Sequence, residues 1–200
     1  MRYLPIGLMY LRLILGILLL PLSIFHIQYY MPVAICIIAM GLLSDILDGI
    51  IARRLGISSS RLRRLDSSID QVFWCMVAIS TFVQWPPFFY RHAIELIILV
   101  SAEAATYITS YIKFRKEVAT HALSSKVWTL LLFATLVEII VTGNSGLLFQ
   151  LCFYIGVITR FEIIAILLLL RSWINDVPSV FHAVKLRQGR IIKRSKWFNG

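Results

Sequence analysis

The sequence contains six apolar runs, and they constrain the fold of this chain more than any other feature. A run of about 20 apolar residues crosses the hydrocarbon core of a bilayer as one α-helix, because a helix satisfies its backbone hydrogen bonds internally. The runs lie near residues 4–26, 31–52, 65–85, 92–112, 126–142 and 147–170. We therefore expect an all-α integral membrane protein with six transmembrane helices.

The composition supports a membrane location. Hydrophobic residues make up 59% of the 200 residues, charged residues only 15%, and the mean hydropathy is +0.82. A soluble domain of this size does not bury so large an apolar fraction. The first run also lacks the small-residue cleavage site of a signal peptide, so we expect it to remain in the protein as a span.

Basic residues gather on one side of the expected bundle. If the N-terminus, the 53–64 loop, the 113–126 loop and the C-terminal segment share a side, that side carries 17 of the 20 lysine and arginine residues. The positive-inside rule makes this side cytoplasmic, and six spans put both termini there. We expect a multi-pass protein of the cell (inner) membrane. The net charge of +10 comes without a nucleic-acid-binding motif, so we expect no nucleic acid partner.

Four of the ten acidic residues fall between positions 45 and 70, within an otherwise apolar chain. Asp45 and Asp48 are three residues apart, so they share one face of a helix. Asp66 and Asp70 are four residues apart and do the same on the next helix. A short loop between two such helices makes them antiparallel, which can bring both pairs together. Taken alone, Asp66 also suits the cap of the second helix.

A cluster of four carboxylates predicts a metal site. The carboxylates repel one another unless cations lie among them, and oxygen ligands suit hard ions such as Mg²⁺, Mn²⁺ or Ca²⁺. The topology places the cluster at the cytoplasmic interface, where divalent ions can act on the phosphate of a lipid. A divalent-ion transporter is another interpretation, but transporters tend to place ionisable groups at the bilayer midplane beside broken helices.

Further charged residues lie inside the expected spans. Arg12 is about two turns inside the first span, so it can extend to the cytoplasmic surface or meet a phosphate. Charged residues of the later spans are unfavourable in lipid unless they are paired, so we expect them to have partners on neighbouring helices. They are Glu95, Glu103, Glu138, Arg160 and Glu162.

The stretch from Asp45 to Asp70 resembles the signature of the CDP-alcohol phosphatidyltransferase family. That signature reads Asp-x-x-Asp-Gly-x-x-Ala-Arg, eight residues, Gly, three residues, Asp, three residues, Asp. Seven of its eight fixed positions match, and they are Asp45, Asp48, Gly49, Ala52, Arg53, Asp66 and Asp70. The eighth is Leu62, where the family has a glycine close to the bound nucleotide. A leucine there would crowd the cytidine or require a different local loop, so the alternative is a family-like protein with lost or altered activity.

The resemblance implies an enzyme of phospholipid biosynthesis. A polar alcohol attacks the β-phosphorus of CDP-diacylglycerol, or of a similar CDP-lipid, and CMP leaves. By position, the four aspartates hold two divalent ions, Mg²⁺ or Mn²⁺, and Asp70 is also the general base for the acceptor hydroxyl. Binding of the CDP moiety is implied for Asp45, Gly49, Ala52, Arg53 and Asp66. We also expect a homodimer.

The acceptor alcohol is not defined by the sequence. An acceptor that carries phosphate needs a cationic pocket, for which Lys126, Arg115 and Lys113 are candidates. Lys126 opens a segment that resembles the start of the family's fifth helix. Basic residues also populate cytoplasmic loops without any ligand, and this alternative stays open for all three.

The C-terminal segment differs from the spans. We expect residues 1–175 to form the six-helix catalytic domain and residues 176–200 a basic, amphipathic tail. In that tail, Pro178 suits the first turn of a short interfacial helix. The basic residues that follow predict contact with anionic membrane lipids.

Overall fold

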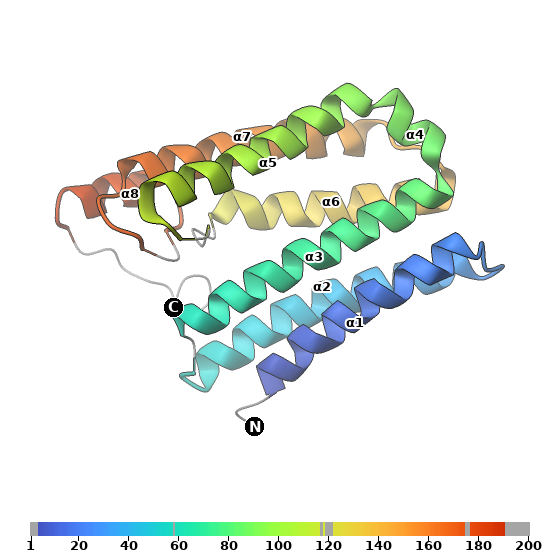
Figure 1. The fold of residues 1–200 in the computed structure, drawn as a ribbon, viewed down its shortest axis with the longest axis horizontal. Helices are drawn as coiled ribbons and strands as arrows, with labels where there is room; N and C mark the ends of the chain where they lie inside the picture. Colours follow the sequence, from blue (N-terminus) through green and yellow to red (C-terminus); the bar gives the residue numbers. More distant parts are fainter. Residues whose placement is uncertain (1–3, 58, 117, 119–121, 175–176, 191–200) are drawn as a thin grey trace. The chain divides into compact units, whose positions relative to one another are not determined.

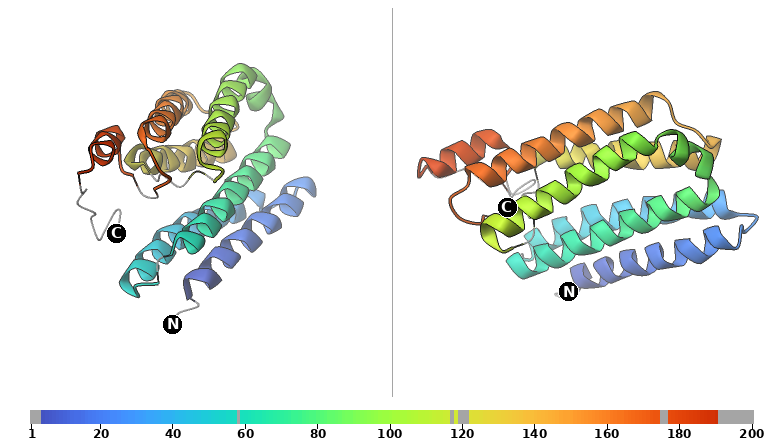
Figure 2. Two further views of the ribbon diagram at one scale, coloured as in Figure 1. Left: turned by 60° about the vertical axis from the view of Figure 1, so that its left-hand side comes forward. Right: turned by 45° about the horizontal axis from the view of Figure 1, so that its top comes forward.

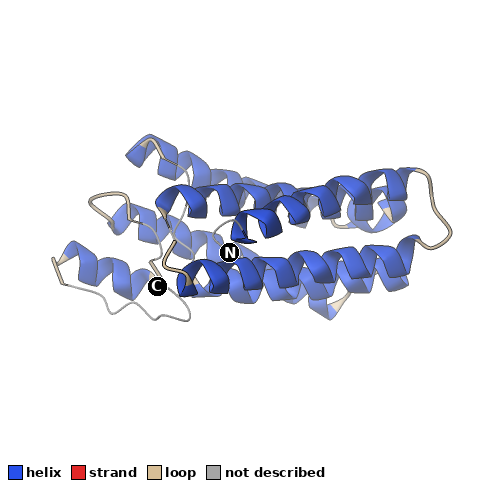
Figure 3. Ribbon diagram, turned by 90° about the horizontal axis from the view of Figure 1, so that it is seen from below, coloured by secondary structure: helices blue, strands red, loops and turns tan. Residues whose placement is uncertain are grey.

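The computed structural model describes residues 4–57, 59–116, 118, 122–174 and 177–190, without the side chains of Arg53, Ser60 and Arg61. Every regular element within these ranges is an α-helix (Figure 3), which confirms the predicted all-helical fold. In chain order (Figure 1), the helices are α1 (Leu4–Ile24), α2 (Tyr30–Arg54), α3 (Ser60–Gln84), α4 (Pro86–Arg91), α5 (Ala93–Phe114), α6 (Leu123–Thr142), α7 (Leu147–Leu169) and α8 (Val180–Arg187).

Five helices of the described chain are long and apolar enough to cross a membrane: α1, α2, α5, α6 and α7. The predicted third span corresponds to α3, which has 25 residues and is not among the five. Its N-terminal half is rich in charged and hydroxyl side chains, which lower its apolar content. The protein therefore has the helices of a multi-pass membrane protein, whereas six spans and cytoplasmic termini stay predictions.

The helices form two compact units. The first comprises residues 1–91 and 133–145, and the second comprises residues 92–132 and 146–200, so α6 contributes to both. The predicted division into a catalytic domain (1–175) and a tail (176–200) concerns function and stays a prediction.

In the first unit, α1 packs against both α2 and α3 (Figure 1). Phe73 of α3 is fully buried and lies where the other two helices carry glycine. A Cβ atom on Gly41 of α2 would overlap the Phe73 ring, and one on Gly16 of α1 would lie 3.2 Å from it. The two glycines thus make room for the aromatic ring, and this packing fixes the register of the three helices.

Hydrogen bonds join the same helices nearer the other end of the unit. The hydroxyl groups of Tyr30 (α2) and Ser80 (α3) are 2.7 Å apart, and the Ser80 hydroxyl also donates to the Leu19 carbonyl of α1 at 3.3 Å. The Gln84 amide donates to the Ser23 carbonyl at 2.9 Å. Side-chain contacts therefore join α1, α2 and α3 at this end as well as around Phe73.

The loop between α2 and α3 is shorter than predicted. The backbone N–H of Leu62 donates to the Ser59 hydroxyl at 3.2 Å, so Ser59 caps α3 and the helix begins at Ser60 instead of near residue 65. A second difference lies between the predicted third and fourth spans, where the chain forms the six-residue helix α4. Proline is compatible with the first turn of a helix, because the N–H it lacks has no partner there.

In the second unit, α5 and α8 both pack against α7 (Figure 2). Its apolar core lies around the C-terminal half of α7 and consists of Ala122, Ile163, Ile166, Leu167, Leu170, Val177 and Ala183. The predicted short C-terminal helix is present as α8, and Ser179 occupies the position before its first residue. Pro178 therefore precedes the helix and does not belong to its first turn, while the interfacial position of α8 stays a prediction.

Two of the predicted interhelical partners are found in this unit. Arg160 of α7 pairs with Glu103 of α5, with 2.5 Å between Nε and Oε2. Ser124 of α6 donates to Glu162 of α7 at 2.6 Å. The prediction was wrong for two other residues, which contact groups near the ends of their own helices: Glu95 contacts His92, and Glu138 contacts Ser145.

Candidate active site

The signature aspartates lie on two consecutive helices of the first unit. Asp45 and Asp48 belong to the C-terminal half of α2, and Asp66 and Asp70 belong to the N-terminal half of α3. Ligand oxygens of Asp45, Asp48 and Asp66 all lie within 4.8 Å of one another. The α2–α3 hairpin therefore brings three of the predicted residues to one point, in the way their spacing indicates.

A buried arginine connects all four carboxylates. Arg12 comes from α1, and its side chain is only 1% exposed. Its Nη1 atom lies 3.2 Å from Asp45 Oδ1 and 3.4 Å from Asp66 Oδ1, and it also contacts Asp70 Oδ1. The Nη2 atom contacts Asp48 Oδ2. The guanidinium of α1 is thus the group through which Asp70 joins the other three aspartates.

The third nitrogen of Arg12 is held separately. Its Nε–H donates to the Ser44 hydroxyl at 3.2 Å, and Ser44 in turn donates to the Gly41 carbonyl at 2.8 Å. Ser44 is itself buried. The planar guanidinium carries five N–H donors, and here it uses them in two directions, toward the carboxylates and toward α2.

Exposure varies across the cluster. The Asp48 side chain is fully buried, whereas those of Asp66, Asp70 and Asp45 are 19%, 28% and 34% exposed. The cluster is therefore closed at Asp48 and open toward Asp45. A ligand can reach it from the side of the three partly exposed aspartates.

The cluster fits a divalent cation by two observations on its residues. All of its ligand atoms are carboxylate oxygens, the type that Mg²⁺ and Mn²⁺ prefer. In addition, Asp48 Oδ1 is buried and has no hydrogen-bond partner among the described residues. A buried acceptor without a partner is unfavourable, and a bound cation would satisfy it.

The remaining signature residues continue along α2 and α3. Gly49 is half-buried and Ala52 is buried, so the helix surface after Asp48 carries little side-chain bulk. Arg53 belongs to α2, but its side chain lies outside the described part of the structure. Leu62 is half-buried in the first turn of α3. Its φ is not positive, so the backbone at this position accommodates leucine as well as glycine.

The three candidates for an acceptor-phosphate pocket all belong to the second unit. The Lys113 ammonium donates to the carbonyls of Leu167 and Leu168, at 2.9 and 2.6 Å, and so binds the C-terminal end of α7. Arg115 is exposed, has a φ of 53° and lies over the Tyr111 ring. Lys126 is exposed in the first turn of α6. Lys113 thus has a structural role, and a role in acceptor binding stays a prediction for all three.

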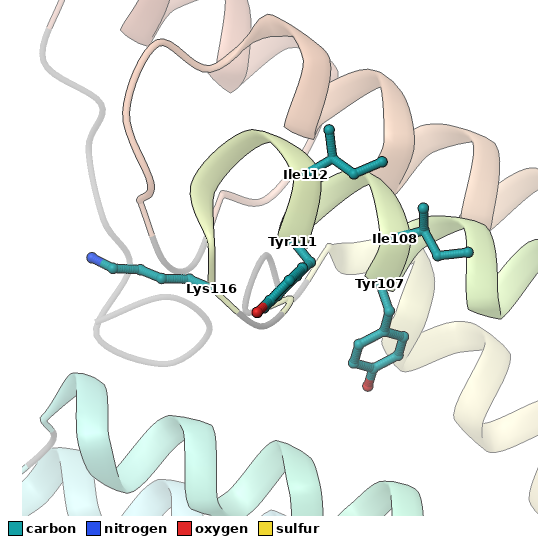
Figure 4. A pocket seen from close by; sticks show the side chains of 5 residues that line it. All are labelled: Tyr107, Ile108, Tyr111, Ile112 and Lys116. Atoms are coloured by element: carbon teal, nitrogen blue, oxygen red, sulfur yellow. The ribbon is translucent and has the colours of Figure 1, made fainter.

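An open groove of about 350 Å³ also lies in the second unit (Figure 4). Four of its lining residues project from α5, and the fifth follows that helix: Tyr107, Ile108, Tyr111, Ile112 and Lys116. The groove contains no residue of the signature. An open apolar surface is ordinary on a helix that crosses a membrane, so the groove by itself does not indicate a ligand site.

The residue that sequence reasoning missed is Arg12. Its position inside an apolar span indicated that it needs a partner, but its expected positions were the membrane surface or a phosphate. In the structure its guanidinium contacts the aspartates of two other helices. Ser44 was missed as well, and a single serine in an apolar helix gives no signal for such a role.

Comparison with known families covers most of the chain. The family model for CDP-alcohol phosphatidyltransferase matches residues 2–174, which include the helices that build the aspartate cluster. Searches of curated proteins and of solved structures gave no match. The chain therefore belongs to the CDP-alcohol phosphatidyltransferase family, whose members are transferases of phospholipid synthesis and generally depend on divalent metals.

Proposed function

We propose that this protein is a metal-dependent phosphatidyltransferase of phospholipid biosynthesis. It transfers the phosphatidyl group of CDP-diacylglycerol, or of a similar CDP-lipid, to a polar alcohol. The observation that carries the proposal is the cluster of Asp45, Asp48 and Asp66, whose ligand atoms lie within 4.8 Å of one another. Oxygen atoms at this spacing can bind a shared divalent cation.

The reaction exchanges one phosphate ester bond for another. The hydroxyl oxygen of the acceptor forms a bond to the β-phosphorus, and the bond from that phosphorus to the bridging oxygen breaks. CMP leaves with the bridging oxygen and its electron pair, and the hydroxyl proton passes to a base. Such a transfer depends mainly on positioning and on neutralisation of phosphate charge.

Asp45, Asp48, Asp66 and Asp70 are the residues proposed to hold two Mg²⁺ or Mn²⁺ ions. When bound, these ions neutralise diphosphate oxygens and stabilise the leaving CMP. The buried Asp48 anchors the inner side of the site, while Asp45, at 34% exposure, faces the side from which the CDP-lipid arrives. The carboxylates are held on helices, so their positions depend little on mobile loops.

Asp70 is the proposed general base. Its side chain is 28% exposed, which leaves room for a hydroxyl group to approach it. A base must come within hydrogen-bond reach of the proton it accepts, and Asp70 lies on the open side of the cluster together with Asp66 and Asp45. It would release the proton to water after CMP has left.

The CDP moiety is proposed to lie along α2. Gly49 and Ala52 give the helix a low surface one to four residues after Asp48, which lets a nucleotide approach the backbone. Arg53 follows directly and would pair with the diphosphate. Asp45 and Asp66 would contact the nucleotide side of the site.

The alternative, a protein with lost or altered activity, depends on Leu62. One argument for this alternative is that leucine requires a different local loop. The backbone at Leu62 is helical, so no special loop conformation is needed. The other argument for lost or altered activity is that the leucine side chain crowds the cytidine. The ligand oxygens of Asp45, Asp48 and Asp66 lie within 4.8 Å of one another in this chain, which carries Leu62, so we favour an active enzyme.

Location and assembly complete the proposal. The protein would lie in the cell (inner) membrane, with its active site on the cytoplasmic side, in contact with anionic lipids and as a homodimer. A phosphate on the acceptor would pair with Lys126 or Arg115, because the Lys113 ammonium already donates two hydrogen bonds to α7. Only the count of basic residues in the loops supports the cytoplasmic orientation.

The test is CMP release by purified protein with CDP-diacylglycerol and Mg²⁺ or Mn²⁺, with one acceptor alcohol at a time. We expect turnover with one acceptor and its loss on addition of a chelator. Asp70→Asn should abolish turnover and leave the protein folded, whereas Glu95→Gln, a carboxylate of α5 outside the cluster, should retain it. Absence of CMP release with every acceptor, or full activity of Asp70→Asn, would contradict the proposal.

A further inference from the structure

Arg12 contacts all four carboxylates of the aspartate cluster with its guanidinium. Its guanidinium is 1% exposed and carries one positive charge beside four carboxylates. A buried cation in a membrane helix is unfavourable without anionic partners, and four close carboxylates are unfavourable without a cation. Each group therefore compensates for the other, and the pairing stabilises the bundle.

Arg12 contacts oxygens of the same four carboxylates that are proposed to hold the metal. Its Nη1 atom lies among the Oδ1 atoms of Asp45, Asp66 and Asp70. Its Nη2 atom contacts Oδ2 of Asp48, whose second oxygen has no hydrogen-bond partner. A divalent ion among these oxygens would occupy the space of the guanidinium nitrogens and would repel their charge.

We propose that Arg12 is an internal counter-cation that competes with divalent ions for the four aspartates. In the metal-free protein it holds the carboxylates of α2 and α3 together, and metal binding moves the guanidinium away from at least part of the cluster. The Nε–H bond to Ser44 involves no carboxylate, so it can persist during this exchange. The inference rests on the proposed function, since it requires that the cluster binds metal.

The direction of the effect follows from linkage. If metal binding and arginine pairing exclude each other, removal of the arginine must strengthen metal binding and weaken the metal-free protein. A residue that positions the carboxylates for the metal would act in the opposite way, because its removal would weaken metal binding. The sign of the change in metal affinity separates the two roles.

The experiment is a calorimetric Mn²⁺ titration of the detergent-solubilised full chain, together with thermal unfolding with and without Mn²⁺. For Arg12→Met we expect a Kd about tenfold lower than that of the unaltered protein, from a coupling of typical size. Its Tm without metal should fall and should largely recover at saturating Mn²⁺. Arg160→Met is the matched control: it removes the buried arginine that pairs with Glu103 in the second unit, so it should lower Tm and leave the Kd unchanged.

A milder variant guards against loss of folding in Arg12→Met. Ser44→Ala removes only the acceptor of the Arg12 Nε–H, so it should loosen the guanidinium and lower the Kd for Mn²⁺ by about twofold to threefold. If the unaltered protein binds Mn²⁺ and both folded variants bind it equally well or more weakly, the inference is overturned and the proposed function stands. If the unaltered protein binds no Mn²⁺ and releases no CMP, both are overturned.

Discussion

Replacement of Gly41 by alanine tests how the three helices α1, α2 and α3 pack around Phe73. A Cβ atom at this position would overlap three ring atoms of Phe73, which is fully buried. The ring cannot yield freely, since Gly16 of α1 lies on its other side. Overpacking of this kind costs about 1–3 kcal/mol, and because the contact involves the ring itself we expect the upper half of that range.

The same substitution also favours the helix, because alanine has a higher helix propensity than glycine by about 1 kcal/mol. The net loss for Gly41→Ala should therefore be about 1–2 kcal/mol. Substitutions at two glycines of α1 provide reference values for this loss of stability. A Cβ on Gly7 meets nothing within 4 Å, so Gly7→Ala should stabilise α1, and Gly16→Ala, with contacts of 3.0–3.2 Å, should fall between the two.

The assay is thermal unfolding of the three single variants in one detergent, followed by circular dichroism. Phe73→Leu in the Gly41→Ala background removes part of the ring that the new Cβ overlaps, so it should recover part of the lost stability. The reasoning is refuted if Gly41→Ala is as stable as Gly7→Ala, or if Phe73→Leu adds its own loss without any recovery.

Two further predictions concern the signature mismatch and the second unit. Leu62→Gly should increase the affinity for a cytidine nucleotide, measured by titration, if the leucine crowds the nucleotide. It should also lower the Tm, because glycine in the first turn of α3 costs about 1 kcal/mol. An unchanged nucleotide affinity would show that Leu62 does not crowd the nucleotide. Glu103→Gln should destabilise the protein by about 2 kcal/mol, because it removes the negative charge that compensates the buried Arg160 and leaves a neutral amide oxygen and the Trp128 ring, 3.6 Å away, to stabilise the guanidinium. An unchanged Tm would show that the charge of Glu103 is not needed.

The sequence predicted the six long helices, because each apolar run has about the length of a span, although α3 is not among the five that are apolar enough to cross a membrane. It also predicted that Asp45, Asp48 and Asp66 meet, since their spacing fixes the helix face and the short loop fixes the antiparallel direction. The start of α3 was less predictable. The Ser59 hydroxyl caps the helix, which begins at Ser60, five residues before the expected start.

Arg12 could not be assigned in the same way. Its partners, from Ser44 to Asp70, lie 32 to 58 residues away in the sequence, on helices whose packing against α1 depends on the shapes of buried side chains. Helix periodicity gives the face of each helix but not its neighbours. The small residues at positions 16 and 41 carry that information only once the Phe73 ring is known to lie between them.

The role of α1 changes how the aspartate cluster must be understood. The signature lies entirely on α2 and α3, yet these two helices contact each other far less than each of them contacts α1. The hairpin alone therefore does not hold the two carboxylate pairs together. In the middle of the bundle, the packing of α1 around Phe73 holds α2 and α3 together. At the cluster itself, the Arg12 guanidinium holds the two carboxylate pairs together. The proposed metal site, whose ligands all come from one segment of the sequence, thus depends on a helix that carries none of them. Changes in α1 should therefore alter metal binding as strongly as changes beside the aspartates.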